Sequence, residues 1–282
     1  MRPELLVFDL DGTLLDRSLR VSDLDVAGAR RAREAGLRVG VATGRMYRSG
    51  LPHALRLGAD LPLICYQGAL IKEMAPSTDE EEMARARVLS QDPVPGELGL
   101  EVLRTCRERG WALNVYQEDR LFVEEITDDI RFYTGIAQVE AEVARDPSLE
   151  ERVERGSTKL TAVVKDEARF REALGELKRR IGDRAEVTRS LVGFCEITAP
   201  GVNKGRALRR LCAHLGVDPD RVLAVGDAPN DLPLLAAAGT RVAVESAAEE
   251  VRRAADWVVP GPGDGGLAEV VRRVLQTPAS AA

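Results

Sequence analysis

The sequence predicts an α/β protein in which a parallel-sheet core is interrupted by an inserted α+β domain. Short apolar runs alternate with helix-like segments at both ends of the chain, the pattern of strands joined by right-handed crossovers. In the middle of the chain this rhythm is lost. Acidic or polar residues follow several predicted strands, and such residues collect at one edge of a parallel sheet.

The N-terminal region supplies the first three strands of the predicted core. Leu5 to Phe8 is a short apolar run suited to a buried strand. A helix is predicted at 26–35, and Gly36 ends it as a C-cap. Further strands are predicted at 37–42 and 63–66. Strands that alternate with helices in this way favour a parallel sheet.

The middle of the chain predicts a separate domain. Its expected elements are helices at 98–109 and 167–181 and strands at 111–116, 120–123 and 160–164. The two neighbouring strands at 111–123 are separated by a short polar turn and predict a hairpin. We therefore expect a cap domain at 81–190, which leaves 1–80 and 191–282 as a discontinuous core.

The core pattern is expected to return from Cys195 onward. A helix is predicted at 204–215, and strands are predicted at 222–226, 241–244 and 257–259, the last at a sheet edge. The predicted helices and strands alternate here as they do at the N-terminus, so both regions are assigned to one sheet.

Composition narrows the class of protein. The chain has 282 residues, 44% hydrophobic and 30% charged, with a formal net charge of -6. This balance is ordinary for a globular protein and argues against nucleic acid as a partner, because phosphate backbones call for basic surfaces. No apolar stretch approaches the roughly 20 residues that a membrane helix needs, and no signal peptide is recognised. We therefore expect a cytoplasmic protein without a membrane partner; the sequence specifies no oligomeric state.

The four cysteines lie far apart, without the spacing of a metal site. A zinc site or a disulfide framework is therefore not expected. Reduced, buried thiols are the simpler interpretation.

Two strand ends carry clustered carboxylates. Asp9 and Asp11 follow the first predicted strand, and residues two apart in extended chain point the same way. Asp227 and Asp231 follow the strand at 222–226. Oxygen ligands of this kind suit Mg²⁺. A polar turn explains a lone Asp-x-Asp equally well, so each cluster alone leaves both interpretations open.

Two further positions suit a phosphate group. Thr43 and Gly44 follow the second predicted strand and offer a hydroxyl and backbone N–H groups. Lys204 begins a predicted helix, where the backbone already favours anions. A lysine opposes that dipole, so a nearby anion explains it better. A strand-to-helix turn and a surface lysine are the alternatives.

Taken together and in this order, these motifs resemble the haloacid dehalogenase superfamily of phosphohydrolases. The four motifs are Asp9-Leu10-Asp11-Gly12-Thr13-Leu14, Ala42-Thr43-Gly44-Arg45, Asn203-Lys204-Gly205 and Gly226-Asp227-Ala228-Pro229-Asn230-Asp231. The insertion looks like the type IIB cap of the Cof-like phosphatases, and Asp264-Gly265-Gly266-Leu267 matches a further family feature. The resemblance covers nearly the whole chain and implies a Rossmann-like core.

Two segments depart from the Cof-like pattern. The family's usual Asn-Gly-Ala after the third strand is Gln67-Gly68-Ala69 in this chain. Its usual Asn-Ala after the strand at 241–244 is replaced by Ser246-Ala247, which follow Glu245. Both departures leave the implied chemistry standing, but a substrate cannot be transferred from the family.

The resemblance implies a role for each motif residue. Asp9 would be the nucleophile, Asp11 the acid and base, and Mg²⁺ would be held by Asp9, the Asp11 carbonyl and Asp227. The residues that would bind the transferring phosphate are Thr43, Gly44, Lys204 and Asn230. Arg45 and Asp231 would support them, and Arg189 beside the return linker is a candidate substrate contact.

Asp11 favours one reaction class within the family. A sugar alkoxide leaves only with a proton, which an aspartate at this position can supply. The leading hypothesis is therefore a Mg²⁺-dependent phosphatase acting on small phosphorylated metabolites, with sugar phosphates favoured and the cap choosing among them. A phosphomutase or phosphotransferase is the alternative enzyme. A non-enzymatic module that binds phosphometabolites is a third hypothesis, which the intact set of motif residues disfavours.

Overall fold

A computed structural model describes residues 2–189 and 193–276. The chain divides into two compact units, a core of Met1–Leu89 with Asn203–Ala282 and a cap of Ser90–Val202. The units divide at 89/90 and 202/203, and the sequence places the boundaries of the cap at 80/81 and 190/191. No helix in the described ranges is long and apolar enough to cross a bilayer.

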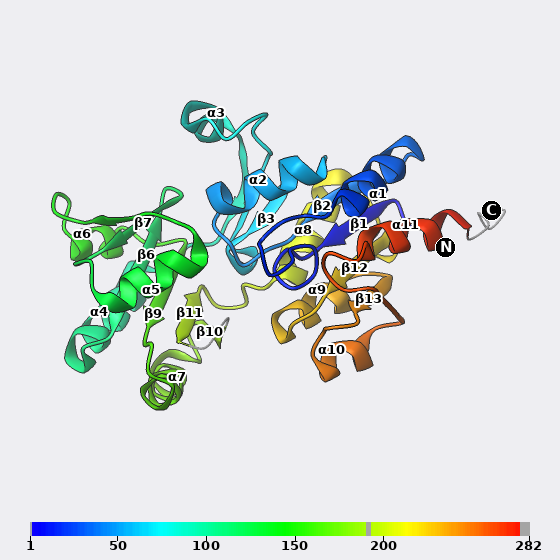
Figure 1. Ribbon diagram of the computed structural model, residues 1–282. Helices are drawn as coiled ribbons and strands as arrows, with labels where there is room; N and C mark the ends of the chain where they lie inside the picture. Colours follow the sequence, from blue (N-terminus) through cyan, green and yellow to red (C-terminus); the bar gives the residue numbers. More distant parts are fainter. Residues whose placement is uncertain (1, 190–192, 277–282) are drawn as a thin grey trace. The chain divides into compact units, whose positions relative to one another are not determined.

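The core is built on a five-stranded parallel sheet with the order β14-β13-β12-β1-β2 (Figure 1). Its strands are β1 (Leu5–Phe8), β2 (Arg38–Val41), β12 (Val222–Gly226), β13 (Thr240–Val244) and β14 (Trp257–Val259). All four residues of β1 are buried, as its position between β12 and β2 requires. The predicted parallel α/β core is confirmed, and β14 lies at the sheet edge as expected.

The core unit also contains seven helices in the described residues, most of which pack around this sheet, whereas α3 lies apart from it. They are α1 (Asp23–Glu34), α2 (Tyr47–Leu57), α3 (Glu80–Arg85), α8 (Lys204–Leu215), α9 (Leu232–Ala236), α10 (Glu249–Ala254) and α11 (Gly266–Gln276), with the short 3₁₀ turns η1 (Tyr66–Gly68), η2 (Pro219–Arg221) and η3 (Pro229–Asp231). α1 and α11 lie side by side (Figure 1). The buried carboxylate of Asp25 in α1 joins them, because it accepts a hydrogen bond of 2.9 Å from the backbone N–H of Leu267 at the start of α11.

A small second sheet has the order β3-β4-β5, formed by β3 (Leu63–Cys65), β4 (Leu70–Lys72) and β5 (Val88–Gln91), and β5 spans the point where the chain passes from the core unit to the cap unit. β3 and β4 are antiparallel, and η1 connects them. The third predicted strand therefore turns back on itself within a few residues.

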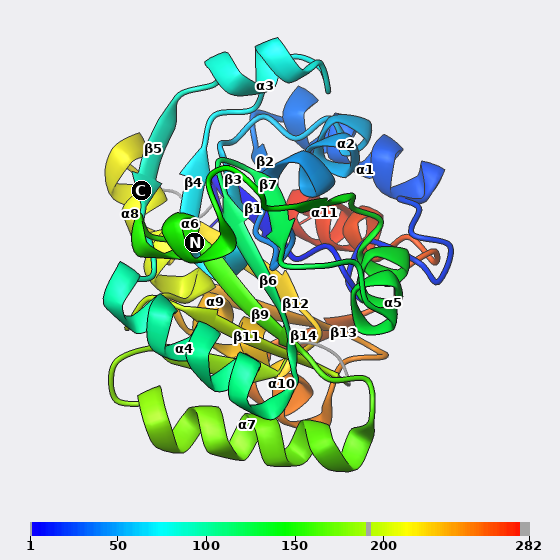
Figure 2. The same ribbon diagram turned by 90° about the vertical axis from the view of Figure 1, so that its left-hand side faces the viewer.

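The cap contains a six-stranded sheet with the order β10-β11-β9-β6-β7-β8. Its elements are β6 (Ala112–Gln117), β7 (Arg120–Val123), β8 (Ala141–Val143), β9 (Lys159–Val163), β10 (Glu186–Arg189), β11 (Phe194–Thr198), α4 (Gly96–Arg109), α5 (Asp128–Ala137), α6 (Leu149–Glu154) and α7 (Glu167–Ile181). α4 and α7 run along this sheet (Figure 2). Alternate strand residues such as Val115, Leu160 and Ile197 pack with apolar residues of these helices, which gives the cap its own core.

β11 corrects one expectation. The segment from Cys195 was expected to resume the core, but β11 pairs antiparallel with both β9 and β10 inside the cap sheet. A short apolar strand has the same composition in either sheet. Its hydrogen-bonded neighbours, which lie far away in sequence, decide where it belongs.

The opposite face of the cap sheet carries buried polar side chains. Lys159 Nζ lies 2.7 Å from Glu196 Oε1, and both side chains are less than 8% exposed. Asn114 lies across from Thr161 and is fully buried, and neither atom of its amide has a hydrogen-bond partner among the described residues. Buried polar groups are normally paired, so this amide is costly to the fold.

Candidate active site

The nucleophile candidate lies where the central strand ends. Asp9 directly follows β1, and its backbone N–H donates to Val225 of β12 at 3.0 Å. Asp227 directly follows β12, so the parallel pairing of these strands brings both carboxylates to one edge of the sheet. One carboxylate oxygen from each of Asp9, Asp227 and Asp231 can be chosen such that all three lie within 4.8 Å of one another. The sequence placed Asp231 in a supporting role, and the structure brings it into the cluster.

Lys204 lies beside this cluster. It begins α8 and is 1% exposed, with Nζ 2.5 Å from Asp9 Oδ1 and 2.6 Å from Asp231 Oδ1. The second oxygen of Asp231 accepts from the backbone N–H groups of Asp227 and Ala228 at 3.0 and 3.1 Å. Asp231 therefore connects the lysine to the turn that carries Asp227. A surface position for Lys204 is excluded.

Burial and charge shift the ionisation of this cluster. Burial first, and then the charge of Asp231, raise the pKa of Asp9 well above its ordinary value, although Lys204 opposes the rise. The same two causes raise the pKa of Asp227 to about 6. Burial alone would lower the pKa of Lys204, but the carboxylates of Asp231 and Asp9 outweigh it and the pKa rises. The lysine stays charged, and the cluster still holds more negative than positive groups.

The donor set fits a magnesium ion. All the ligand candidates in the cluster are carboxylate oxygens, the ligands Mg²⁺ prefers, and their mutual repulsion calls for a cation. Gly12 allows the approach. Its φ is +84°, and a methyl group built on it would lie 2.3 Å from Asp227 Oδ2. A side chain at position 12 would therefore displace one of the candidate ligands.

Asp11 is held in a different manner from Asp9. The guanidinium of Arg45 approaches its carboxylate with Nε 2.8 Å from Oδ2 and Nη2 2.6 Å from Oδ1, a fork of two parallel hydrogen bonds. The side chain of Asp11 is 49% exposed, whereas that of Arg45 is 12% exposed. The more buried arginine thus fixes the orientation of the more exposed carboxylate.

The turn at Thr43 and Gly44 follows β2. Thr43 is fully buried, its N–H donates to Ile64 O at 2.8 Å, and its hydroxyl accepts from the N–H of Arg45 at 3.1 Å. The amide of Gln67 packs on Gly44, because a methyl group built there would lie 2.4 Å from Gln67 Nε2. Asn230 Nδ2 donates to Gln67 Oε1 at 3.0 Å. In the sequence, Gln67 stands out only as a departure from a family pattern, and no local signal indicates these contacts.

Two other sequence-selected positions are described within the unit that carries each of them. Arg189 belongs to β10 of the cap, where its guanidinium lies 5.5 Å from the ring of Phe170. Glu245 and Ser246 line a separate core cavity of about 560 Å³ together with Asp16 and Asp264. A substrate contact by Arg189 remains a prediction. All four cysteines are buried free thiols, as expected.

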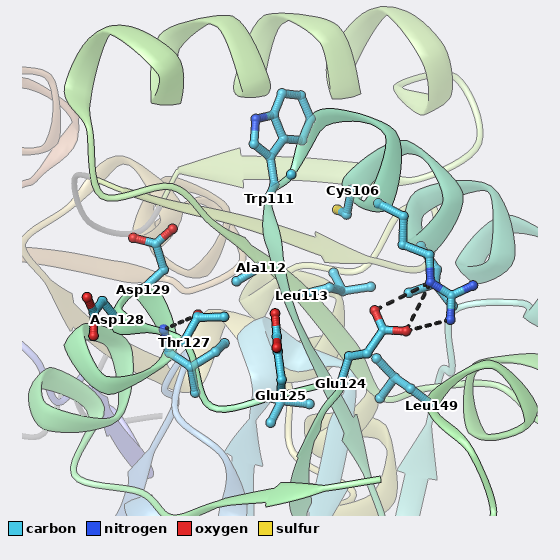
Figure 3. A pocket seen from close by; sticks show the side chains of 15 residues that line it. Cys106, Trp111, Ala112, Leu113, Glu124, Glu125, Thr127, Asp128, Asp129 and Leu149 are labelled. Atoms are coloured by element: carbon cyan, nitrogen blue, oxygen red, sulfur yellow. Dashed lines mark hydrogen bonds and ion pairs between the residues drawn. The ribbon is translucent and has the colours of Figure 1, made fainter. Parts of the chain in front are cut away.

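The cap contains a pocket of its own, shown in Figure 3. Its volume is about 530 Å³, and the carboxylates of Glu124, Glu125, Asp128 and Asp129 lie among its lining residues. The lining residue Arg107 donates to Glu124 at 2.8 Å and also to Glu150. A phosphate dianion would meet net negative charge in this pocket, so it is unsuited to phosphate chemistry.

Comparison with known proteins agrees with this geometry. Residues 6–271 match the family sequence model of the haloacid dehalogenase-like hydrolases. The chain is 30% identical over 273 residues to a phosphoglycolate phosphatase of Methanopyrus kandleri, covering 96% of this chain and 97% of that protein. It is 25% identical over 292 residues to the 5-amino-6-(5-phospho-D-ribitylamino)uracil phosphatase YwtE of Bacillus subtilis, with 96% and 97% covered.

A solved structure from Thermotoga maritima has the same fold. It superposes with a TM-score of 0.84 at 30% identity and covers 100% of both chains. The predicted membership in the superfamily and in its Cof-like group is thereby confirmed. The chain belongs to the haloacid dehalogenase-like hydrolases, and it is a phosphoric monoester hydrolase.

Proposed function

We propose that this enzyme is a Mg²⁺-dependent phosphatase that hydrolyses small phosphorylated metabolites, with sugar phosphates as the favoured class, through an aspartyl-phosphate on Asp9. The observation that carries the proposal is the buried cluster at the end of β1. There Asp9 contacts Lys204 and lies within 4.8 Å of two further carboxylates, measured between candidate ligand oxygens. A binding module would have no need of such a costly arrangement of charges.

Asp9 acts as the nucleophile. A carboxylate oxygen attacks phosphorus, and the bond from phosphorus to the leaving oxygen breaks with its electron pair on that oxygen. The ammonium of Lys204, already against Asp9, stabilises the charge that spreads over the transferring oxygens. Thr43, Gly44 and Asn230 supply the further hydrogen-bond donors. Asp231 keeps Lys204 oriented through its contact of 2.6 Å.

The metal site is assigned to Asp9, Asp227 and the backbone carbonyl of Asp11, with Asp231 in a supporting role. When bound, Mg²⁺ would neutralise charge between the carboxylates and the phosphate so that two anions can approach. The raised pKa values of Asp9 and Asp227 support this assignment, because their burial and mutual repulsion are relieved by a cation.

Asp11 moves the protons. It gives a proton to the leaving alkoxide, then takes one from the water that attacks the phosphoenzyme, and the bond from Asp9 to phosphorus breaks. Arg45 sets the direction of this carboxyl through the paired hydrogen bonds described above. Because alkoxides leave poorly without a proton, this residue favours sugar and polyol phosphates as substrates.

The decisive experiment separates the two N-terminal aspartates. Asp11→Asn should slow a sugar phosphate by about 10²–10⁴-fold but spare the first step with an aryl phosphate, whose leaving group is stable as an anion. We expect a burst of released phenol in a molar amount about equal to that of the enzyme, followed by slow turnover. Labelled phosphate should stay trapped on the protein.

Asp9→Asn is the matched control and should give neither burst nor trapped label. Equal loss of the first step with both substrates, without a burst, would remove Asp11 as the acid and base. Burst and label in Asp9→Asn would remove Asp9 as the nucleophile. A phosphotransferase would release less free phosphate than leaving group when a sugar acceptor is added, and a phosphatase would release equal amounts.

A further inference from the structure

The turn between β3 and β4 has an unusual backbone. Tyr66 and Gln67 have φ values of +52° and +60°, a left-handed conformation in which glycine or asparagine is normally found. Two hydrogen bonds hold the turn against the predicted phosphate-binding segment. Tyr66 N–H donates to Arg45 O at 2.9 Å, and Gln67 N–H donates to Thr43 O at 3.1 Å. Backbone strain of this kind persists where the surrounding structure enforces it, often at functional sites.

The strained turn directs the Gln67 side chain toward two site segments. Gln67 is 8% exposed. Its amide oxygen accepts from Asn230 Nδ2 at 3.0 Å. Its Nε2 and Cδ would lie 2.4 and 2.9 Å from a methyl group built on Gly44, so the amide packs directly on that glycine. One side chain therefore contacts two segments to which phosphate binding is assigned.

The topology makes this contact significant. Gly44 lies beyond β2 and Asn230 lies beyond β12, while β1, which ends at Asp9, runs between those two strands. Gln67 thus connects the loops on both sides of the nucleophile's strand. The turn is also seated on the start of α8, because a methyl group on Gly68 would lie 2.5 Å from Asn203 O.

We infer that Gln67 is a positioning residue that holds the Gly44 turn and the Asn230 amide at a fixed separation around the transferring phosphoryl group. The inference rests on the proposed function. The oxygens of a phosphoryl group in transfer must be met by donors that are already in place, and these donors belong to separate loops. The buried amide of Gln67 contacts both the Gly44 turn and Asn230, so these two segments are held together and do not move independently.

The test compares Gln67→Met with wild type. Methionine has a similar length but lacks the amide, so the carbonyl oxygen that accepts from Asn230 Nδ2 is lost. We expect kcat/KM for an aryl phosphate to fall about 10- to 100-fold, the range for residues that orient groups of the active site. Inhibition by orthovanadate, which occupies the phosphoryl site, should weaken by a similar factor. The Mg²⁺ concentration for half-maximal activity should not change, because the described side-chain contacts of Gln67 are with Asn230 and Gly44, which are not assigned as metal ligands.

Gln138→Met is the matched control. Gln138 is an exposed glutamine with a φ of +51° in the cap unit, so this variant reports the effect of the same substitution on a left-handed backbone that does not belong to the core unit. It should keep wild-type kinetics. Gln67→Gly is a second test variant for the case in which Gln67→Met does not fold, because glycine adopts this φ freely. It should fold and show the same kinetic loss.

A double-mutant cycle tests the connection itself. In an Asn230→Ala background, Gln67→Met should cost much less than in wild type, because the contact it removes is already gone. Activity of Gln67→Gly within twofold of wild type, or an undiminished loss in the Asn230→Ala background, would overturn the inference. If wild type itself released no phosphate from any phosphomonoester, the proposed function would fail instead, which keeps the two failures distinct.

Discussion

Lys204 offers the sharpest test of how the core cluster is stabilised. Its ammonium is 1% exposed and contacts Asp9 at 2.5 Å and Asp231 at 2.6 Å, and those carboxylates are 5% and 1% exposed. Lys204→Met keeps an unbranched side chain of nearly the same length and removes its charge. Breaking a buried ion pair by removing one partner costs about 3–5 kcal/mol, because the remaining charge is buried without compensation.

The expected loss lies at the lower end of that range. Asp9 already has a raised pKa, so it can take up a proton when the lysine is absent and avoid part of the cost. We therefore expect the free energy of unfolding of the metal-free core to fall by about 3 kcal/mol at neutral pH. With a urea m-value of about 1–3 kcal/mol/M, the midpoint should fall by about 1 M or more.

The assay uses the two tryptophans of the chain. Trp257 lies in β14 of the core, and Trp111 lies in the cap. In a Trp111→Phe background, the fluorescence change in urea therefore reports the core unit alone. Phosphatase activity, measured with Mg²⁺, should be lost with Lys204→Met.

Lys72→Met is the matched control. Lys72 is another buried lysine of the core, but its ammonium lies 4.5 Å from the centre of the Tyr47 ring instead of between carboxylates. A cation–π contact contributes about 0.5–2 kcal/mol, so its loss should be smaller. Adding Asp9→Asn to Lys204→Met should restore part of the lost stability. If Lys204→Met costs no more than the control, or Asp9→Asn restores nothing, the electrostatic reasoning is refuted.

Three further predictions concern the metal, the C-terminal helix and the cap. Mg²⁺ at about 100 times its Kd should stabilise the protein by about 2.7 kcal/mol and raise its Tm by about 5–10 °C; Asp227→Asn should remove that rise in a thermal scan. Hydrogen bonds from Arg272 and then Arg273 lower the pKa of Glu269 from 4.5 to about 2. The stabilisation contributed by the charged Glu269 side chain is therefore complete above pH 4.5 and is lost as the pH falls through about 2. Glu269→Gln should accordingly lower the free energy of unfolding at pH 7 and have little effect on it at pH 2. An equal effect at both pH values in urea unfolding would contradict this reasoning. Asn114→Leu should stabilise the cap by about 1–3 kcal/mol, followed by Trp111 fluorescence, because it removes a buried amide without partners; a loss of stability would indicate that the amide is satisfied in solution.

Much of the core was predictable because its signals are local. A short apolar run such as Leu5 to Phe8 predicts a buried strand, and the residue that follows it, Asp9, must lie at the sheet edge. β12 was predicted with the bounds Val222–Gly226 that the structure shows. Because parallel strands end at the same edge, motifs far apart in sequence were expected to converge, and Asp9, Asp227 and Lys204 do lie together.

The cap was less predictable because its pattern depends on pairing. α5, α6 and the short strand β8 were not predicted, and β11 was expected in the core instead of beside β9. These elements are short, and their composition does not distinguish one sheet from another. Hydrogen bonding between distant segments selects the sheet, and that information is absent from any local window.

The finer features of the site were decided by the tertiary structure alone. The sequence indicated that Arg45 and Asp231 would support the site, but the fork from Arg45 to Asp11 and the contact of Asp231 with Lys204 join segments separated by tens of residues or more. Gln67 is the clearest case. Its chemistry is ordinary, and its contact with Asn230 spans 163 positions in sequence. Residue type determines which interactions a side chain is able to make, whereas the packing of strands and turns determines which partner comes within reach, because hydrogen bonds and ion pairs act over only a few ångströms.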